Sequence, residues 1–405
     1  MKIAIATAVY YPQINGVAMF SHNIAKGLAK RGNEVMVITP SQNGKNHTEM
    51  QDGVKVVYLR SIDVKVYPDQ IHEVTAKKKL IYKHGLKASV FPRGEVRKAL
   101  DEFRPDVVHV QVSDPVGLSV VSYARRHGIP VVTTEHNQPE VLTESLKLPR
   151  VFKSGANVVL SAYFRNRHGK SDFVTMPTEK AILSLLKKHE LKVPIAAVSN
   201  GVDLSAFRPG KVSKAIYEKY GIPQGAPIVL YIGRVDPEKK VGVVIRAFEL
   251  ASRKVPEAEM VVVGDGVDKA RLVKAAKSNP KVHFLGKVLP PDLYELYKVG
   301  TVFVTASEIE TQGIVLIEAA ASGLPLIAVD KGAVAEVCID GKNGCLCQPG
   351  SVEGIAEAIV KILSDSEMRE RYTEESIKIA HQHDFETTLD RFMNIYGRLV
   401  KKGKV

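Results

Sequence analysis

The 405-residue sequence predicts an α/β protein of two domains, each built on a parallel β-sheet with helices on both faces. Two patterns support this prediction. Short β-branched runs alternate with amphipathic helical runs, and the strand-like runs are apolar throughout. Strands of that kind are typical of parallel sheets that are buried on both faces. Twelve such runs are too many for one compact sheet, and the chain is long enough for two domains.

The expected strands fall into two groups on either side of NGVDLSAFRPG, residues 200–210, which has the composition of a linker loop. Seven strands are expected in the first group and five in the second, at residues 2–9, 34–40, 54–60, 107–112, 130–136, 173–178 and 196–201, then 227–234, 259–266, 282–287, 301–307 and 324–330. We therefore expect two Rossmann-like domains, residues 1–195 and 196–380, whose sheets face a central cleft.

Helices are expected where apolar residues recur at helical spacing, namely at residues 17–32, 243–255, 269–278, 291–300, 313–323 and 385–402. The last of these helices follows the second sheet in the chain. Residues 381–405 are therefore expected to pack back on the first domain.

Several protein classes are disfavoured. No run approaches the roughly 20 apolar residues that span a bilayer. The start, MKIAIATAVYYP, fits a buried strand better than a signal peptide, because only Lys2 precedes the apolar run and Tyr-Tyr-Pro follows it. We expect a cytoplasmic chain. Cys338, Cys345 and Cys347 lack a nearby fourth ligand, so they are expected to be ordinary thiols and not a zinc site.

The net charge of +13 is unevenly distributed. Residues 1–200 contain 29 Lys and Arg against 17 Asp and Glu, whereas the rest of the chain contains 28 and 27. Almost all of the basic excess therefore belongs to the first domain, which indicates an anionic partner for that domain. No recognised nucleic-acid motif is present, so nucleic acid is not the expected partner.

Ligands of parallel α/β sheets bind beyond the carboxyl ends of the strands, so the residues that follow each strand are the first site candidates. Gly16 precedes a long helix, where a small residue lets a phosphate approach the helix N-terminus. Arg234 and Lys239 follow the first strand of the second domain, and two cations there suit a diphosphate. The alternatives are an ordinary turn at Gly16 and a solvated charged loop at 234–239.

The stretch ETQGIVLIEAAASG contains two carboxylates in a run that is otherwise mostly apolar or small. A helix is expected to begin there, so its first amides would be unsatisfied donors, those of Gly313, Ile314 and Val315. Glu310 in the loop and Glu318 in the second helical turn could accept hydrogen bonds from sugar and ribose hydroxyls. The alternative is a surface charge near a helix cap and a charge on a helix face.

Two histidines are further candidates. His136 ends a strand in TTEHNQPE and is expected to face the cleft. His109 lies within or at the end of a strand, either as an acceptor-site residue or as a structural histidine. The chain has no H-E-x-x-H, G-x-S-x-G or P-loop motif, and no G-x-G-x-x-G follows a strand, which disfavours a dehydrogenase.

In their order along the chain, these motifs resemble those of glycosyltransferase family 4. The resemblance covers nearly the whole sequence and rests on YYPQINGVA, PDVVHVQ, TTEHNQP, SNGVDLSAFRP, YIGRVDPEKKV, VVVGDG, VHFLGKV, ETQGIVLIEAAASGLPLIA and GAVAEVCIDGKNG. Members of that family are retaining enzymes with the GT-B fold. The resemblance implies a nucleotide sugar as co-substrate, and no metal or other cofactor.

The resemblance also implies residue roles. Arg234 and Lys239 would hold the diphosphate and stabilise the leaving group. Glu310 would bind donor-sugar hydroxyls, Glu318 would bind the ribose, and His136 would lie near the anomeric carbon. The remaining implied contacts are those of Gly16 and of the Gly313, Ile314 and Val315 amides with phosphate and sugar, and of Gly286 and Lys287 with the nucleobase.

One departure from the family pattern bears on the acceptor. Many members have Phe-Gly where this chain has Gln312 and Gly313. The ETQG form looks like that of membrane-bound enzymes that glycosylate diacylglycerol, whereas the Phe-Gly form is common in phosphatidylinositol mannosyltransferases.

Two basic segments in the first domain suit an anionic membrane surface. Residues 75–100 contain eight Lys or Arg and one acid, and residues 146–170 contain six and no acid, with apolar residues interleaved. Such a composition favours a helix that lies in the membrane surface, the alternative being a solvated helix face. The candidate contacts are Lys77, Lys78, Lys79, Lys83, Lys87, Arg150, Lys153, Arg165 and Arg167.

The sequence therefore predicts a hexosyltransferase bound peripherally to the inner face of the cell membrane. It would move glucose from UDP-glucose to a lipid such as diacylglycerol and form an α-glycolipid. The alternatives are phosphatidylinositol with GDP-mannose, a soluble sugar or polysaccharide acceptor, and a nucleotide-sugar-binding protein without catalysis. The sequence does not indicate the oligomeric state.

Overall fold

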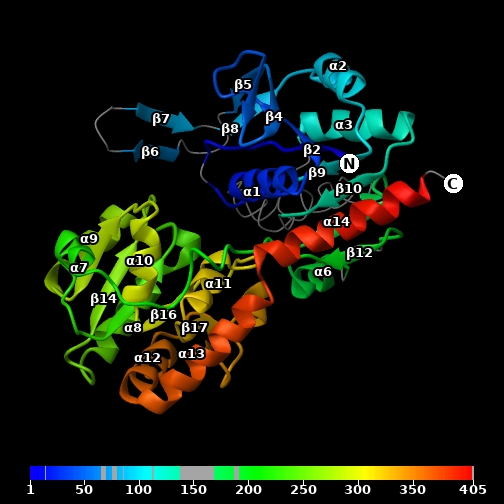
Figure 1. The fold of residues 1–405 in the computed structure, drawn as a ribbon. Coiled ribbons are helices and arrows are strands. Elements are labelled where there is room, and N and C mark those ends of the chain that lie inside the picture. Colours follow the sequence, from blue (N-terminus) through cyan, green and yellow to red (C-terminus); the bar gives the residue numbers. More distant parts are fainter. Residues whose placement is uncertain are drawn as a thin grey trace, which may run out of the picture. The chain divides into compact units, whose positions relative to one another are not determined.

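The computed structural model describes residues 1–13, 15–64, 70–74, 80–84, 86–111, 114–136, 168–186 and 191–403. The chain forms two compact units, which Figure 1 shows as separate groups of elements. Unit 1 is Met1–Val198 with Leu389–Val405, and unit 2 is Ser199–Thr388. The chain thus crosses between the units twice, after Val198 and after Thr388.

Within the described residues, unit 1 contains an eight-stranded sheet in the order β12-β11-β10-β9-β1-β2-β4-β3. Seven strands are parallel and overlap the seven predicted strands, although β12 shares only residues 196 and 197 with the predicted 196–201. The strand β3 pairs antiparallel with β4 at one edge. The strands are β1 (Lys2–Ala6), β2 (Glu34–Pro40), β3 (His47–Gln51), β4 (Val54–Leu59), β9 (Val107–Val110), β10 (Val131–Thr134), β11 (Phe173–Met176) and β12 (Ile195–Ala197).

The helices of unit 1 that the structure describes are α1 (Gly16–Lys30), α2 (Arg93–Phe103), α3 (Pro115–Arg126) and α6 (Glu179–Leu186). Local sequence explains two of their starts. The Asn15 side chain accepts a hydrogen bond from the Ala18 amide, and Asp114 does the same for Gly117 before Pro115 in the first turn. Each helix therefore begins where a capping residue follows a strand.

The basic segment 75–100 is not one helix, so the expectation of a membrane-lying helix there is wrong for the part that the structure describes. Two small antiparallel pairs form instead, β5 with β8 and β6 with β7, and a helix begins only at Arg93. The strands are β5 (Ser61–Val64), β6 (Gln70–Val74), β7 (Leu80–His84) and β8 (Leu86–Ser89). Isoleucine, valine and tyrosine residues in β5, β6 and β7 favour strands over helix.

Unit 2 contains a six-stranded parallel sheet in the order β15-β14-β13-β16-β17-β18. Five of these strands were predicted, and β18 was not. Successive side chains of β13 enter different cores, since Tyr231 packs with α8 and α12 while Leu230 packs with α10 and α11. The strands are β13 (Ile228–Ile232), β14 (Glu259–Val263), β15 (Val282–Gly286), β16 (Val302–Val304), β17 (Leu326–Val329) and β18 (Gly344–Cys347).

Helices connect the strands of unit 2, as the parallel sheet requires, while α7 precedes the first strand and α12 and α13 follow the last. They are α7 (Lys214–Tyr220), η1 (Pro237–Lys239), α8 (Val241–Ala251), α9 (Lys269–Ala275), η2 (Ala276–Ser278), α10 (Asp292–Val299), α11 (Ile314–Ala321), η3 (Gly332–Glu336), α12 (Val352–Ser364) and α13 (Ser366–His381). The three cysteines of this unit are free thiols, with Cys338 and Cys347 buried. Burial raises the pKa of the Cys338 thiol well above its usual value.

The C-terminal helix α14 (Phe385–Lys402) belongs to unit 1 from Leu389 onward. Its Phe392 and Tyr396 side chains are fully buried in that unit. Their rings lie 5.0 and 5.7 Å from the His109 ring on β9. The last helix of the chain thus completes the core of the first unit.

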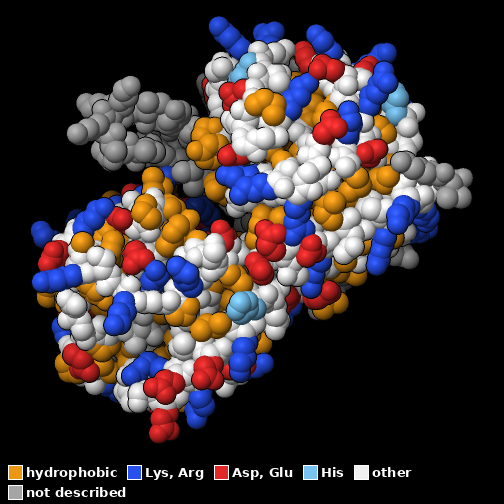
Figure 2. Space-filling view, in the orientation of Figure 1, with side chains coloured by type: hydrophobic (Ala, Val, Ile, Leu, Met, Phe, Trp, Pro, Cys, Tyr) orange, Lys and Arg blue, Asp and Glu red, His pale blue; other side chains and the backbone are white. Residues whose placement is uncertain are grey.

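Two surface properties bear on membrane binding. No helix in the described part of the chain is both long and apolar enough to cross a bilayer. On the face of unit 2 that Figure 2 shows, Lys and Arg side chains are interspersed with Asp and Glu. This mixed distribution agrees with the near-neutral charge of the second half of the sequence.

Candidate active site

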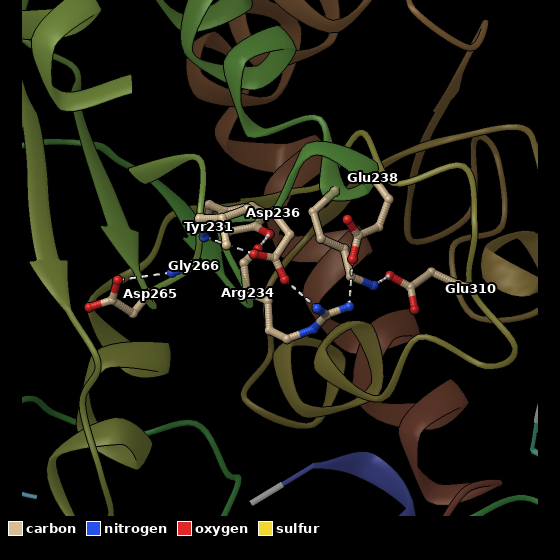
Figure 3. Close-up of polar contacts among 9 residues, drawn as sticks. Tyr231, Arg234, Asp236, Glu238, Asp265, Gly266 and Glu310 are labelled. Carbon is tan, nitrogen blue, oxygen red and sulfur yellow. Dashed lines mark hydrogen bonds and ion pairs between the residues drawn. The ribbon is translucent and has the colours of Figure 1, made fainter. Parts of the chain in front are cut away.

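The loop after β13 holds Arg234 between two carboxylates (Figure 3). The guanidinium donates to Asp236 and, over 2.7 Å, to Glu238. Tyr231 holds the loop in place, because its hydroxyl donates to the Arg234 carbonyl oxygen over 2.7 Å. Arg234 is half exposed, so an anionic ligand can approach it and replace its carboxylate partners.

Lys239 ends the short helix η1 and forms an ion pair with Glu310, with 2.6 Å between Nζ and Oε1. Both side chains are 17 % exposed. Lys240 and Lys331 bind the neighbouring Glu308, and these two ammonium groups hold the pKa of the Glu308 carboxyl below its usual value. The structure therefore brings together Lys239 and Glu310, which lie 71 residues apart in the chain.

Gly313 is the residue before the first turn of α11, as the sequence predicts. Its backbone is in the left-handed region, with φ of 78°, which favours glycine. The helix then begins at Ile314, and the first backbone amides of a helix have no partner within it. The loop that carries Glu310 thus ends in a group of amide donors suited to an anion.

Glu318, in the second turn of α11, has a partner that the sequence did not indicate. The Tyr297 hydroxyl on α10 donates to its Oε2 over 2.5 Å. Burial raises the pKa of the Glu318 carboxyl to about 7, and the bond from Tyr297 opposes that rise only in part. The carboxyl is therefore poised to change its protonation state near neutral pH.

Gly286 and Lys287, the predicted nucleobase contacts, lie at the end of β15. The Gly286 carbonyl oxygen accepts a hydrogen bond from the Gly264 amide of the adjacent β14 loop over 2.8 Å. Burial lowers the pKa of the Lys287 ammonium. Gly286 is the last residue of β15 and Lys287 follows it, and β15 pairs with β14, which in turn pairs with β13. Because these three strands are parallel, they end at the same edge of the sheet.

His136, in unit 1, follows β10 and is buried in a hydrogen-bond network. Its Nε2 lies 2.7 Å from Gln111 Oε1, and the Phe20 ring contacts it edge-on at 5.2 Å between centroids. Because an amide oxygen can only accept, Nε2 carries the proton.

His109 is fully buried, so the structure does not place it where it could touch an acceptor. Its Nε2 lies 2.7 Å from Thr134 Oγ1, and its Nδ1 lies 2.6 Å from the Tyr396 hydroxyl. Gln111 Nε2 is 3.1 Å from His109 Nε2. Burial lowers the pKa of His109 to about 3, so the ring is neutral and supports Gln111 and, through it, His136.

Gly16, the remaining predicted donor residue, is exposed at the start of α1, and a Cβ there would meet no neighbour within 4 Å.

Among the basic residues predicted to contact a membrane, Lys87 is only 15 % exposed and pairs with Asp63 over 2.6 Å. The side chains of the others lie outside the described residues, namely Lys77, Lys78, Lys79, Lys83, Arg150, Lys153, Arg165 and Arg167.

Sequence reasoning missed the partners of the predicted residues. Glu238 could have been noticed, because it follows Arg234 at helical spacing. Tyr297 and Tyr396 gave no signal, since each contacts its partner only through tertiary packing.

Two family profiles match the chain. The profile "Glycosyltransferase Family 4" matches residues 14–206, and "Glycosyl transferases group 1" matches residues 212–379. Among curated relatives, a GDP-mannose-dependent alpha-mannosyltransferase of Mycobacterium tuberculosis is 30 % identical over 92 % of this chain and 90 % of its own. An alpha-monoglucosyldiacylglycerol synthase of Acholeplasma laidlawii is 28 % identical over 85 % of this chain and 84 % of its own.

Solved structures show the same fold. A sucrose-phosphate synthase from Thermosynechococcus elongatus aligns with a TM-score of 0.75 at 18 % identity, over 99 % of both chains. Anabaena HepE in complex with UDP-glucose aligns with a TM-score of 0.72 at 17 % identity, over 98 % of this chain and all of that one. The chain therefore belongs to glycosyltransferase family 4 and is a hexosyltransferase with the GT-B fold.

Proposed function

We propose that this hexosyltransferase moves glucose from UDP-glucose to a membrane lipid such as diacylglycerol, with retention of configuration and without a metal ion. One observation supports the donor part above all. Lys239, Glu310 and the N-terminus of α11 come together after neighbouring strands of one sheet. A cation and free amides suit a diphosphate, and a carboxylate suits sugar hydroxyls.

In the proposed reaction, the acceptor hydroxyl oxygen attacks the anomeric carbon on the face from which the diphosphate leaves. The bond between that carbon and the diphosphate oxygen breaks, and the hydroxyl proton passes to the leaving phosphate. Arg234 and Lys239 would exchange their carboxylate partners for the diphosphate and stabilise its developing charge. His136 would lie near the anomeric carbon, and Glu318 would accept from the ribose.

Two observations support a lipid acceptor, namely the names of two relatives and the basic excess of the first 200 residues. Relatives from Acholeplasma laidlawii and Streptococcus pneumoniae are named alpha-monoglucosyldiacylglycerol synthases. The excess of basic residues in the first 200 positions suits an anionic membrane surface, at about 1 kcal/mol for each basic residue near it. These features favour peripheral binding at the inner face of the cell membrane.

A second donor is favoured by one comparison. The relative at 30 % identity is named a GDP-mannose-dependent alpha-mannosyltransferase. Transfer of mannose from GDP-mannose to a lipid would use the same diphosphate contacts and would differ only at the nucleobase and the sugar.

The test is a thermal-shift panel of UDP-glucose, GDP-mannose and other nucleotide sugars, followed by product analysis with lipid extract and EDTA present. We expect one sugar nucleotide to raise the melting temperature and to yield an α-linked glycolipid. Absence of any glycolipid, together with transfer to a soluble sugar, would refute the lipid acceptor.

Liposome flotation tests the membrane part separately. We expect the protein to float with liposomes that contain an anionic lipid and to remain unbound with neutral ones. Equal recovery from both at moderate salt would contradict an electrostatic contact with the membrane.

A further inference from the structure

Gln312 lies in the candidate donor loop, directly before Gly313 and two residues after Glu310. The side chain is 1 % exposed. Its Nε2 donates to Ser199 Oγ over 2.6 Å, and its Oε1 accepts from the Asn200 amide over 3.0 Å. Both ends of the amide group are therefore bonded to one short segment of unit 2.

That segment follows the first crossing of the chain between the units, because Ser199 is the first residue of unit 2. Ser199 also contacts the second crossing. His383 Nδ1 lies 3.1 Å from Ser199 Oγ, and Thr388 Oγ1 donates to the Ser199 carbonyl oxygen over 2.9 Å. Thr388 is the last residue of unit 2, so Gln312 is bonded through Ser199 to both crossings.

The two crossing segments, residues 199–202 and 383–388, are also joined through their backbones. The Val202 amide donates to the His383 carbonyl over 2.9 Å, and the Phe385 amide donates to the Val202 carbonyl over 3.1 Å. Gly201, which precedes Val202 in the first crossing segment, has φ of +73°. A Cβ at this position would lie 2.7 Å from both Phe385 Cα and Thr388 Oγ1 of the second crossing segment. Packing this close leaves no room for one segment to shift alone.

We propose that Gln312 is a positioning residue that couples occupation of the donor loop to the two crossing segments. The proposal rests on the proposed function, because it takes Glu310 and the α11 amides as donor contacts. Sugar hydroxyls that bind Glu310 draw it from Lys239, and the resulting shift of the loop reaches Ser199 through Gln312, two residues further on. A phenylalanine at position 312 could form neither the hydrogen bond to Ser199 nor the hydrogen bond from the Asn200 amide.

The ligand that operates this coupling is a nucleoside diphosphate that carries its sugar. A nucleoside diphosphate alone contacts the cations and amides but offers no hydroxyls of a donor sugar to Glu310. The coupling therefore distinguishes the intact nucleotide sugar from the nucleoside diphosphate that remains after transfer. It does so through the hydrogen bond from Gln312 to Ser199, which the neighbouring ion pairs do not replace.

Hydrogen exchange of the full-length protein tests this. In the wild type, saturating UDP-glucose or GDP-mannose, whichever is the substrate, should slow exchange at the Asn200, Gly201 and Val202 amides about threefold or more. The matching diphosphate, UDP or GDP, should not. In Gln312→Leu this response should vanish, while protection of the Ile314 and Val315 amides by the donor remains.

Kinetics provide a second readout. Gln312→Leu should lower kcat about tenfold while the donor KM changes less than about threefold, because the change affects the loop and removes no ligand contact. Ser199→Ala should have a smaller effect in the same direction, and the double variant should resemble Gln312→Leu alone, since both remove one shared bond. Gln348→Leu, an exposed glutamine of the same unit, is the matched control and should behave as the wild type.

The possible outcomes distinguish a failure of the proposed coupling from a failure of the proposed donor site. Donor protection at Ile314 and Val315 without any response at residues 200–202, or an intact response in Gln312→Leu, would overturn the coupling alone. No protection at Ile314 and Val315 in the wild type would overturn the proposed donor site itself. If Gln312→Leu melts well below the wild type, Ser199→Ala decides, and an unchanged response in that variant contradicts the proposal.

Discussion

Different kinds of interaction hold the candidate residues of the two units in place. In unit 1, His136 belongs to a buried hydrogen-bond network that runs through Gln111 and His109 to Tyr396. In unit 2, Arg234 and Lys239 are paired with carboxylates and partly exposed. The first arrangement fixes one geometry, because each broken bond leaves a buried polar atom unsatisfied. The second can exchange partners with a charged ligand, since partly exposed ion pairs contribute little stability.

The largest expected effect tests whether unit 1 depends on α14 for its geometry. Phe392→Ala removes a fully buried ring that contacts both His109 and Tyr396. We expect a loss of about 3–5 kcal/mol in the free energy of unfolding, from lost burial and the cavity that remains. Denaturant titration measures it. Arg398→Ala, at an exposed position of the same helix, should change stability by less than about 0.5 kcal/mol.

The next effect tests whether the charged cluster of unit 2 carries the reaction. Lys239→Ala and Glu310→Ala should each reduce transfer a hundredfold or more, about 3 kcal/mol of transition-state stabilisation. Initial rates with the identified donor and acceptor measure the loss. Lys331→Ala removes an ion pair of the same loop region that has no proposed donor contact, and it should retain rates within about threefold. Wild-type rates in either of the first two variants would refute their roles.

A smaller effect is expected from the hydrogen-bond network of unit 1. Gln111→Leu deprives His136 Nε2 of its acceptor, so the ring can change tautomer. We expect kcat to fall about tenfold with the donor KM unchanged, which corresponds to one hydrogen bond of about 1.4 kcal/mol. Tyr123→Phe, which removes a hydrogen bond to Asp101 on the surface of the same unit, is the control. An unchanged kcat in Gln111→Leu would show that the network has no part in the reaction.

The smallest effect concerns the pH dependence contributed by Glu318, whose pKa burial raises to about 7. The folded state holds this proton more tightly than the unfolded state, so the associated stability is present at low pH and is lost as pH rises through 7. The carboxylate form, which accepts from the ribose, grows over the same range. Donor affinity should therefore rise from pH 6 to pH 8, measured with UDP-glucose, whose diphosphate diester keeps its charge there. Glu318→Gln should abolish both trends.

The sequence predicts the sheets better than the contacts at their edges. The seven parallel strands of unit 1 and five of the six in unit 2 read as continuous apolar runs, because both faces of each sheet are buried. The missed strand β18, Gly-Cys-Leu-Cys, is short and contains no β-branched residue.

The placement of the charged candidate residues could be predicted because most of them lie in loops that follow strands, and the carboxyl ends of parallel strands share one edge. The buried partners could not. Tyr396 lies 287 residues from His109 in the chain, and Tyr297 reaches Glu318 from another helix. Such pairs depend on how helices pack, which periodicity does not encode.

The arrangement of α14 has a consequence for the order in which the protein matures during synthesis. Residues 199–388 leave the ribosome complete, whereas the first unit waits for the segment that begins at Leu389. At roughly 5–20 residues per second, translation of the intervening unit takes on the order of ten to forty seconds. Throughout that interval the nascent first unit leaves exposed the apolar surface that Phe392 and Tyr396 later cover.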